Sequence, residues 1–149
     1  MTLIFRTAEE RDVAAFVGLL KDDDIGLKRE TADIQVYLDV FRRVQSDPAA
    51  EIIVGDKGGT IVACYQLNAI EGLSHNGLRR GQLEDVRVAN DCRGQGIGKL
   101  LMQDAFERAR AMGCGVMQLV AHTDRKRTEK FYRSVGFQVS HSGFKKPLD

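Results

Sequence analysis

Long apolar runs and strong net charge are both missing from this chain of 149 residues. No stretch approaches the roughly 18 consecutive apolar residues of a membrane-spanning helix, and Arg6 interrupts the N-terminus too early for the core of a secretory signal. The 22 Lys and Arg residues nearly balance the 21 Asp and Glu residues, and no basic stripe with interleaved aromatic residues occurs. We therefore expect no membrane contact, no nucleic-acid partner and a cytoplasmic location.

Cysteine, histidine and proline are scarce, and tryptophan is absent. The three cysteines, Cys64, Cys92 and Cys114, are odd in number and lie too far apart for a disulfide framework or a CxxC pair. None of the three histidines has the close spacing of metal ligands. We expect reduced, mostly structural thiols and no metal. The remaining composition, 43% hydrophobic and 29% charged, is that of one globular domain spanning residues 1–149.

Hydrophobic periodicity divides the first half of the chain into helices and strands. The elements that it predicts are a strand at residues 3–6, a helix at 12–20, a polar turn at 22–26, a helix at 34–44, and a hairpin of strands at 51–55 and 60–67. The glycine-containing turn at residues 56–59 joins the two strands of that hairpin.

The second half continues with a strand at residues 83–88 and a helix at 97–112. Residues 116–121 form a short apolar run that is typical of a strand buried on both faces. A polar helix at about 124–135 and a final strand at 137–144 complete the chain. This order predicts an α/β (α+β) domain with a mixed central β-sheet flanked by about four helices.

The turn between residues 88 and 97 is the most informative segment. Gly94, Gly96 and Gly98 directly follow a predicted strand and enter a helix, so several backbone N–H groups are free to face a ligand. The helix N-terminus favours an anion, and Arg93 and Lys99 add positive charge, so phosphate or pyrophosphate is the natural occupant. The alternative is that the glycines only form a tight loop.

Two other nucleotide-binding motifs do not match this turn. A Walker loop needs Ser or Thr after its Gly-Lys pair, whereas Leu100 follows Lys99. A dinucleotide-binding GxGxxG motif fails on the spacing of the glycines and on its position, because two helices already precede the turn.

Three segments of the chain resemble the GCN5-related N-acetyltransferases (GNAT superfamily). The sequence Arg93-x-x-Gly96-x-Gly98, between a Val-x-Val strand end and a Leu-Leu helix, is similar to the acetyl-CoA motif of that family. Residues 131–137, with Tyr132 and the Gly136-Phe137 pair, resemble its closing motif, and residues 5–12 resemble its first strand and turn. The resemblance spans essentially the whole chain and implies a GNAT-like domain.

The resemblance also implies acetyl-CoA as cosubstrate and places it on this sequence. Main-chain groups of Val86, Arg87 and Val88 would pair with the pantetheine arm along an open strand edge. The pyrophosphate would lie on the residues of the glycine-rich turn, which are Arg93, Gly94, Gln95, Gly96, Ile97, Gly98 and Lys99. Arg125 stands where the family often has Asn, so it either meets the CoA phosphates or belongs to a solvated basic patch.

The catalytic residues are also implied by the resemblance. The family transfers acetyl directly to an amine, so a base must remove a proton from the amine, and Glu84 is the candidate. Asp85 is the adjacent alternative on the opposite face of the strand, and Glu84 is otherwise a surface carboxylate. Tyr132 would donate its proton to the leaving thiolate, unless it is a core aromatic residue. Cys92 is treated as incidental because direct transfer needs no thiol nucleophile.

The acceptor is expected to be a primary amine, most simply of a small molecule. Residues 67–80 would contribute to its site, with Glu71 or residues 22–24 attracting a cation, or Arg79 and Arg80 attracting a carboxylate. Alternative functions are acetylation of a peptide or protein amine, and a catalytically inactive domain that binds acyl-CoA as a sensor or interaction module. A homodimer is expected only by analogy, through the free edge of the final strand.

Overall fold

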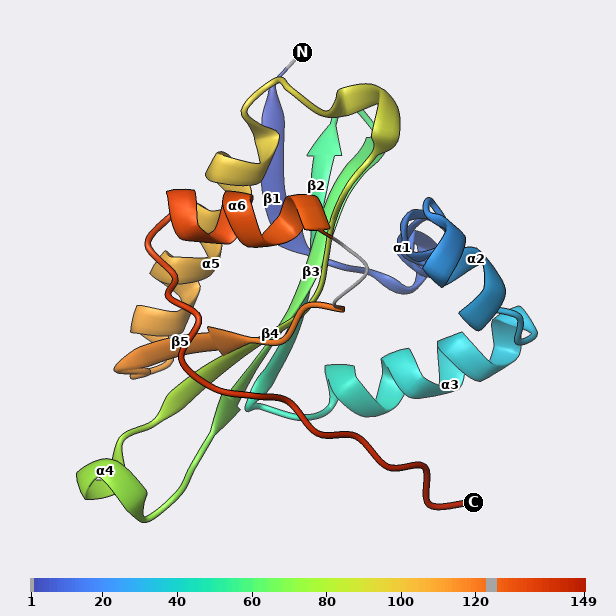
Figure 1. Ribbon diagram of the computed structural model, residues 1–149. Helices are drawn as coiled ribbons and strands as arrows, with labels where there is room; N and C mark the ends of the chain where they lie inside the picture. The colour runs from blue at the N-terminus through green and yellow to red at the C-terminus, as the bar shows by residue number, and fades with distance from the viewer. Residues whose placement is uncertain (1, 123–125) are drawn as a thin grey trace.

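The computed structural model describes residues 2–122 and 126–149 and shows one mixed sheet with helices on both sides (Figure 1). The strands, in spatial order, are β1 (Leu3–Thr7), β2 (Ala50–Lys57), β3 (Thr60–Ile70), β4 (Arg80–Val88) and β5 (Val116–Leu119). The helices are α1 (Val13–Leu20), α2 (Asp24–Arg29), α3 (Ile34–Gln45), α4 (Ser74–Gly77), α5 (Ile97–Ala111) and α6 (Lys126–Ser134). Neighbouring strands are antiparallel from β1 to β4, and β4 and β5 are parallel.

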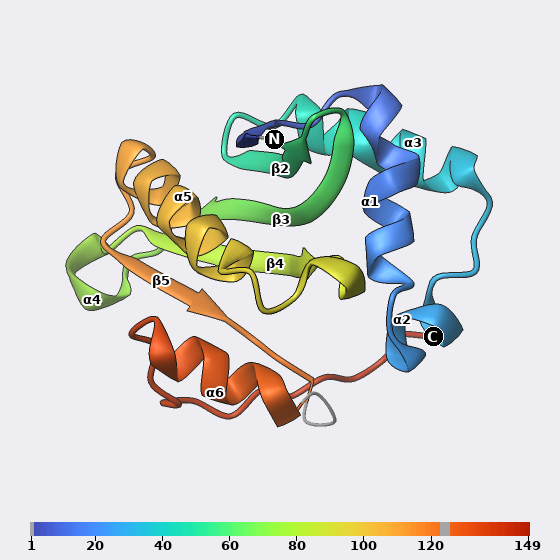
Figure 2. The same cartoon turned by 90° about the horizontal axis from the view of Figure 1, so that it is seen from above.

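The sheet has a separate hydrophobic cluster on each face, as the alternation of side chains along a strand requires. On one face, helices α1 and α3 pack through Val17 and Phe41 against Val54 of β2. On the other face, α5 packs through Leu101 against Tyr65 of β3. The viewpoint of Figure 2 shows α1 and α3 at one side of the strands, away from α5 and α6. The predicted mixed sheet is therefore confirmed.

A buried ion pair joins β1 to the turn before α1. The Arg6 guanidinium donates to both carboxylate oxygens of Asp12, at 2.7 and 3.0 Å, and also reaches Asp56 of β2 at 3.1 Å. Asp12 is only 5% exposed and accepts a further hydrogen bond from the backbone N–H of Glu9 at 2.8 Å. The hydrogen bonds from Arg6 hold the pKa of Asp12 below its ordinary value.

A second polar network fixes α5 to the sheet. The hydroxyl of Tyr65, a fully buried residue of β3, donates to Asp104 of α5 at 2.5 Å. Arg108 donates to Asp104 at 2.8 Å and to the backbone carbonyl of Phe5 in β1 at 3.2 Å. Since burial and the adjacent carboxylate raise the pKa of Tyr65, the hydroxyl keeps its proton and remains a donor.

The segment at residues 22–26 is not the predicted polar turn. Asp23 accepts a hydrogen bond from the N–H of Gly26 at 2.6 Å and caps the short helix α2. A Cβ at Gly26 would collide with the carbonyl oxygen of Leu20, so only glycine allows this close approach. The four long helices agree with the prediction, and α2 and α4 are two short additions within the described residues.

Two predictions for the end of the chain are wrong. The strand β5 is not buried on both faces, because it lies at the edge of the sheet, and Val116 is 41% exposed. Residues 137–144 form no strand in the structure. A strand needs a partner edge for its hydrogen bonds, and this segment pairs with no strand of the described chain.

Replacing Asp12 by asparagine removes the charge and keeps the shape of the side chain. We expect a loss of about 1.5–3 kcal/mol in the free energy of unfolding at neutral pH, as for a hydrogen bond to a charged group. Because the folded-state pKa of Asp12 is lowered, its contribution is present above pH 3.8, its ordinary pKa, and declines as the pH falls below that value.

Urea unfolding over a pH series measures this difference, with Asp39→Asn on exposed α3 as the control, for which little change is expected. The account would be contradicted if the difference in the free energy of unfolding between wild type and Asp12→Asn stayed constant down to the lowest pH at which both proteins fold.

Candidate functional site

The central feature of the site is the point at which β4 and β5 stop pairing. The parallel pairing runs only from Arg80 and Val116 to Leu83 and Leu119. Beyond Leu83, β4 continues to Val88 while pairing with β3 on its other edge. Among the described residues, the β4 edge that faces β5 therefore has no strand partner from Glu84 to Val88. We call this the β4–β5 opening.

A bulge in β4 lies at the start of this opening. Cys64 pairs with Arg87 and Gln66 pairs with Glu84, so Asp85 and Val86 together stand opposite the single residue between them on β3. Asp85 has a φ of 57°, which is uncommon for a residue other than glycine. A bulge bends and twists its strand, which accounts for the separation of β4 from β5 at this point.

A small cavity of about 50 Å³ lies at the β4–β5 opening. It is lined by residues of β4, of the end of β5 and of α6, namely Leu83, Asp85, Val86, Arg87, Leu119, Val120, Ala121, Thr128 and Tyr132. Asp85 and Tyr132 therefore both contribute to the wall of this cavity. Glu84 does not line the cavity; it is exposed and accepts a hydrogen bond from Gln82 at 3.3 Å.

The glycine-rich turn has the geometry that an anion-binding loop requires. Gly94 and Gly96 adopt the left-handed φ values of 79° and 80°, and α5 begins at Ile97 with no side chain capping its N-terminus. A Cβ at Gly98 would lie 3.0 Å from the ring of Phe131, so that position is kept small by the packing of α6. Glycine is thus required at positions 94 and 96 by the left-handed backbone and at position 98 by the lack of room for a side chain.

The side chains of this turn divide into two groups. Arg93, Gln95 and Lys99 are exposed, whereas Ile97 is only 5% exposed and belongs to the core beneath α5. Ile97 is therefore available to a ligand only through its backbone. The exposed cations at both ends of the turn add to the positive end of the helix dipole.

An unpredicted contact holds the beginning of this turn. The backbone N–H of Asn90 donates to the Asp22 carboxylate at 2.9 Å, and the Asn90 side-chain amide donates to the Asp22 carbonyl at 2.8 Å. The contact ties the end of α1 to the segment that precedes Gly94. Asp22 thus has an internal role, and Asp23 caps α2, so two of the three carboxylates expected to attract a cation are already used. The separation of 68 residues gives no sequence signal for this contact.

The sequence left two roles open for Tyr132, a core aromatic residue or a proton donor to the leaving thiolate, and its position is compatible with both. Its ring packs edge-on against Phe131, at a centroid distance of 5.4 Å, and against Phe137 at 5.7 Å. The same residue is only half-buried and lines the cavity. The aromatic cluster therefore holds the ring in a defined orientation at the β4–β5 opening.

The cysteines offer no nucleophile. Burial and the neighbouring carboxylate of Asp91 raise the pKa of the Cys92 thiol, and burial raises that of Cys64. Both thiols are therefore protonated at neutral pH. This agrees with the interpretation of Cys92 as incidental.

Several candidate residues lie away from the cavity. Arg79 pairs with Glu71 at 2.8 Å and donates to the Met112 carbonyl at 2.5 Å, so neither charge is presented to the β4–β5 opening. Figure 1 shows α4 and its flanking segments at the end of the sheet opposite the glycine-rich turn. Residues 67–80, which were expected to contribute to the acceptor site, do not line this cavity. Arg125 lies outside the described residues.

Two kinds of feature are absent from the described residues, 2–122 and 126–149. No helix there is long and apolar enough to cross a membrane. No group of three or more His, Cys, Asp or Glu side chains there is placed to hold a metal ion.

The comparisons with known proteins agree with this geometry. The model of the Acetyltransferase (GNAT) family matches residues 19–137. An aminoalkylphosphonate N-acetyltransferase of Salmonella typhimurium is 29% identical over 82% of this chain and 79% of its own length. A crystal structure from Bacillus halodurans, described as a transcriptional regulator, is 35% identical with a TM-score of 0.93, covering 99% of this chain and all of that one.

A predicted acetyltransferase from Clostridium acetobutylicum, solved with acetyl-CoA, has the same fold, with a TM-score of 0.77 at 17% identity over 99% of this chain and 97% of its own. Acetyl-CoA is the cosubstrate of this family. Together with the open edge of β4 and the glycine-rich turn, the family match over most of the chain leads to one conclusion: the chain belongs to the GNAT family and is an acetyl-transferring enzyme.

Proposed function

We propose that this enzyme transfers the acetyl group of acetyl-CoA directly to the primary amine of a small molecule. We also propose that residues 1–149 form one catalytic domain and that the enzyme acts in the cytoplasm as a homodimer. The observation that carries the proposal is the open β4 edge beside the uncapped N-terminus of α5. The edge offers backbone groups to an extended amide-bearing arm, and the turn offers N–H groups to a pyrophosphate. The cysteines, which form no disulfide in the structure, support the location.

The proposed chemistry needs one bond formed and one broken. The amine nitrogen attacks the thioester carbonyl carbon, the C–N bond forms, and the C–S bond breaks to release the CoA thiolate. The chain must accept a proton from the amine and return one to the sulfur. Holding the two reactants in attack geometry is the larger contribution, on the order of 7–11 kcal/mol in favourable cases.

We assign the two proton transfers to side chains that line the cavity. Asp85 lines this space and Glu84 does not, so Asp85 is the better placed base, acting on the amine through water. Tyr132 on the opposite wall is the proposed proton donor to the thiolate. Asp85 also occupies a strained backbone conformation, and strain of this kind is concentrated at functional sites.

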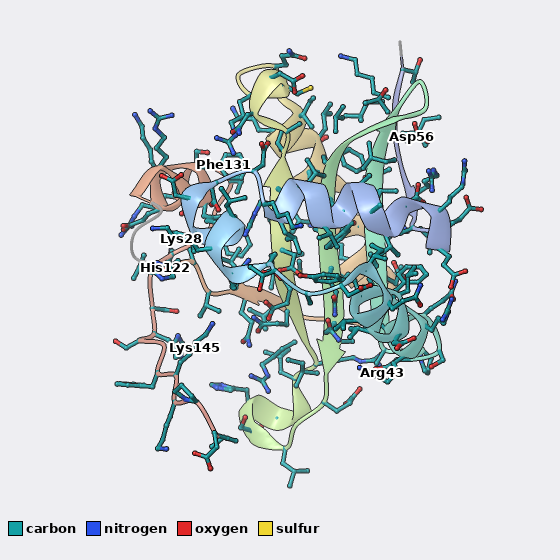
Figure 3. All side chains as sticks on the ribbon, turned by 90° about the vertical axis from the view of Figure 1, so that its right-hand side faces the viewer. Lys28, Arg43, Asp56, His122, Phe131 and Lys145 are labelled. Atoms are coloured by element: carbon teal, nitrogen blue, oxygen red, sulfur yellow. The ribbon has the colours of Figure 1, made fainter. Side chains whose placement is uncertain are left out.

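We further propose that the acceptor bears an anionic group in addition to its amine. The acidic candidates Asp22, Asp23 and Glu71 are all engaged within the protein. In contrast, Lys28 of α2 has no acidic partner among the described residues, and the view in Figure 3 shows it on the same side of the molecule as His122, which follows β5. The named activity of the Salmonella relative, on an aminoalkylphosphonate, supports the same class of acceptor.

The variant Gly96→Glu tests the cofactor site by placing a bulky negative charge in the glycine-rich turn. Isothermal titration calorimetry should show micromolar binding of acetyl-CoA to the wild type and at least tenfold weaker binding to the variant. Gly77→Glu is the matched control, because Gly77 has a similar φ of 74° and open space around it. It lies in α4, at the end of the sheet opposite the glycine-rich turn. An equal loss of affinity in both variants, or wild-type affinity in Gly96→Glu, would contradict the assignment.

The roles of Asp85 and Tyr132 are tested by kinetics. Asp85→Asn and Tyr132→Phe should each lower kcat by on the order of 100-fold while leaving the Kd for acetyl-CoA unchanged, as expected for a general base and a general acid. Asparagine tolerates a left-handed backbone, so the bulge is retained. Glu84→Gln is the control and should retain most of its activity; a larger loss in Glu84→Gln than in Asp85→Asn would reverse the assignment of the base.

The class of acceptor is tested with an aminoalkylphosphonate and the uncharged alkylamine of equal length. Lys28→Ala should raise KM for the phosphonate several-fold and leave KM for the alkylamine and for acetyl-CoA unchanged. Arg43→Ala removes a cation on α3 that Figure 3 shows at the opposite side of the molecule, and it should change neither value. Equal KM values for the two amines with the wild-type enzyme would exclude recognition of the anionic group.

A further inference from the structure

A fully buried cysteine contacts the bulge that carries Asp85. Cys64 of β3 is 0% exposed, and its pairing partner on β4 is Arg87, two residues beyond Asp85. The thiol of Cys64 donates to the backbone carbonyl of Asp85, with 3.5 Å between the sulfur and the oxygen. The proposed reaction leaves this thiol unused, although it contacts the backbone of the proposed base.

The carbonyl that accepts this hydrogen bond belongs to the irregular part of β4. Asp85 and Val86 stand opposite a single residue of β3, and a bulge of this kind disrupts the ladder of backbone hydrogen bonds. A side-chain donor at this point adds a link between the two strands. An S–H group is a weak donor in water, but a hydrogen bond is stronger in a buried site of low dielectric constant.

The backbone of Asp85 is strained and needs such a link. Its φ of 57° lies in the left-handed region, and a residue other than glycine stays there only when the surrounding structure determines its conformation. The carbonyl carbon and Cβ are both bonded to the same Cα. A contact that fixes the carbonyl of Asp85 therefore also fixes the direction in which its side chain leaves the backbone.

The surroundings of Cys64 keep its thiol in the donor form. The residues clustered with it include Val17, Phe41 and Val54, all of them apolar and buried. Burial raises the pKa of the Cys64 thiol, and the negative charge of Asp85 raises it further. The proton therefore stays on the sulfur at neutral pH and remains available to the carbonyl.

We propose that Cys64 is a positioning residue for acetyl transfer, because its hydrogen bond to the Asp85 carbonyl holds the bulge in the conformation that keeps the Asp85 side chain in the wall of the cavity. This inference rests on the proposed role of Asp85 as the base. Cys64 itself does not line the cavity, so it acts on the reaction only through Asp85. The thiol takes no part in covalent chemistry.

Steady-state kinetics tests the role of the thiol. Cys64→Ala should lower kcat by about tenfold, the effect of losing one hydrogen bond, and should leave the Kd for acetyl-CoA unchanged. Cys64→Ser keeps a donor and should restore most of this loss. Val54→Ala is the control for packing, because Val54 is also 0% exposed and pairs with Cys64; it should lower the urea midpoint but keep kcat. Wild-type kcat in Cys64→Ala, or an equal loss of kcat in all three variants, would overturn the proposal.

A double variant tests whether the thiol acts through Asp85. Cys64→Ala/Asp85→Asn should have the same kcat as Asp85→Asn alone, because the carboxylate that the thiol positions is already removed. A further loss of about tenfold in the double variant, the full effect expected of an independent site, would overturn the proposal.

Raman spectroscopy observes the hydrogen bond without using catalysis. The background Cys92→Ser/Cys114→Ser leaves Cys64 as the one cysteine of the chain. Its S–H stretching band should lie at a lower frequency than that of a simple alkyl thiol in a hydrocarbon solvent. A band at the frequency of the free thiol would overturn the inference. If Asp85 is not the base, Asp85→Asn stays active while the band keeps its low frequency, so that failure is distinguishable from a failure of the thiol contact.

Discussion

The functional site depends on the early end of the pairing between β4 and β5. If the parallel ladder continued past Leu83 and Leu119, the backbone groups of residues 84–88 would be used within the sheet. The bulge at Asp85 and Val86 breaks the ladder instead and frees one edge of β4 while β3 holds the other. Free backbone donors and acceptors on an otherwise rigid strand are well suited to bind an extended ligand without rearrangement.

The rest of the fold holds this opening in a fixed position relative to the glycine-rich turn. The network of Tyr65, Asp104 and Arg108 fixes α5 against the sheet, and the contact between Asp22 and Asn90 fixes the segment before the turn. Because α6 presses Phe131 against Gly98, the helix that carries Tyr132 is positioned by the same turn. The proposed acid, base and cofactor-binding groups therefore share one rigid support.

Local patterns in the sequence predicted most of this arrangement, and long-range contacts explain most of the errors. Apolar spacing located the long helices and the five strands, and the glycines indicated the turn, because both signals are contained within a few residues. The choice between Glu84 and Asp85 depends on a bulge that no periodicity reveals. The contact between Asp22 and Asn90 depends on tertiary structure, and so does the lack of a strand partner for residues 137–144 among the described residues. Strand-like composition alone therefore misassigned that last segment.

Amide hydrogen exchange with and without acetyl-CoA tests the central claim most directly, because it observes the backbone groups on which the account rests. The account predicts that residues 84–88 and 94–99 exchange more slowly in the presence of acetyl-CoA, while the amides of β1 and β2 are unaffected. If acetyl-CoA binds but these two segments exchange at unchanged rates, the β4–β5 opening is not the cofactor site.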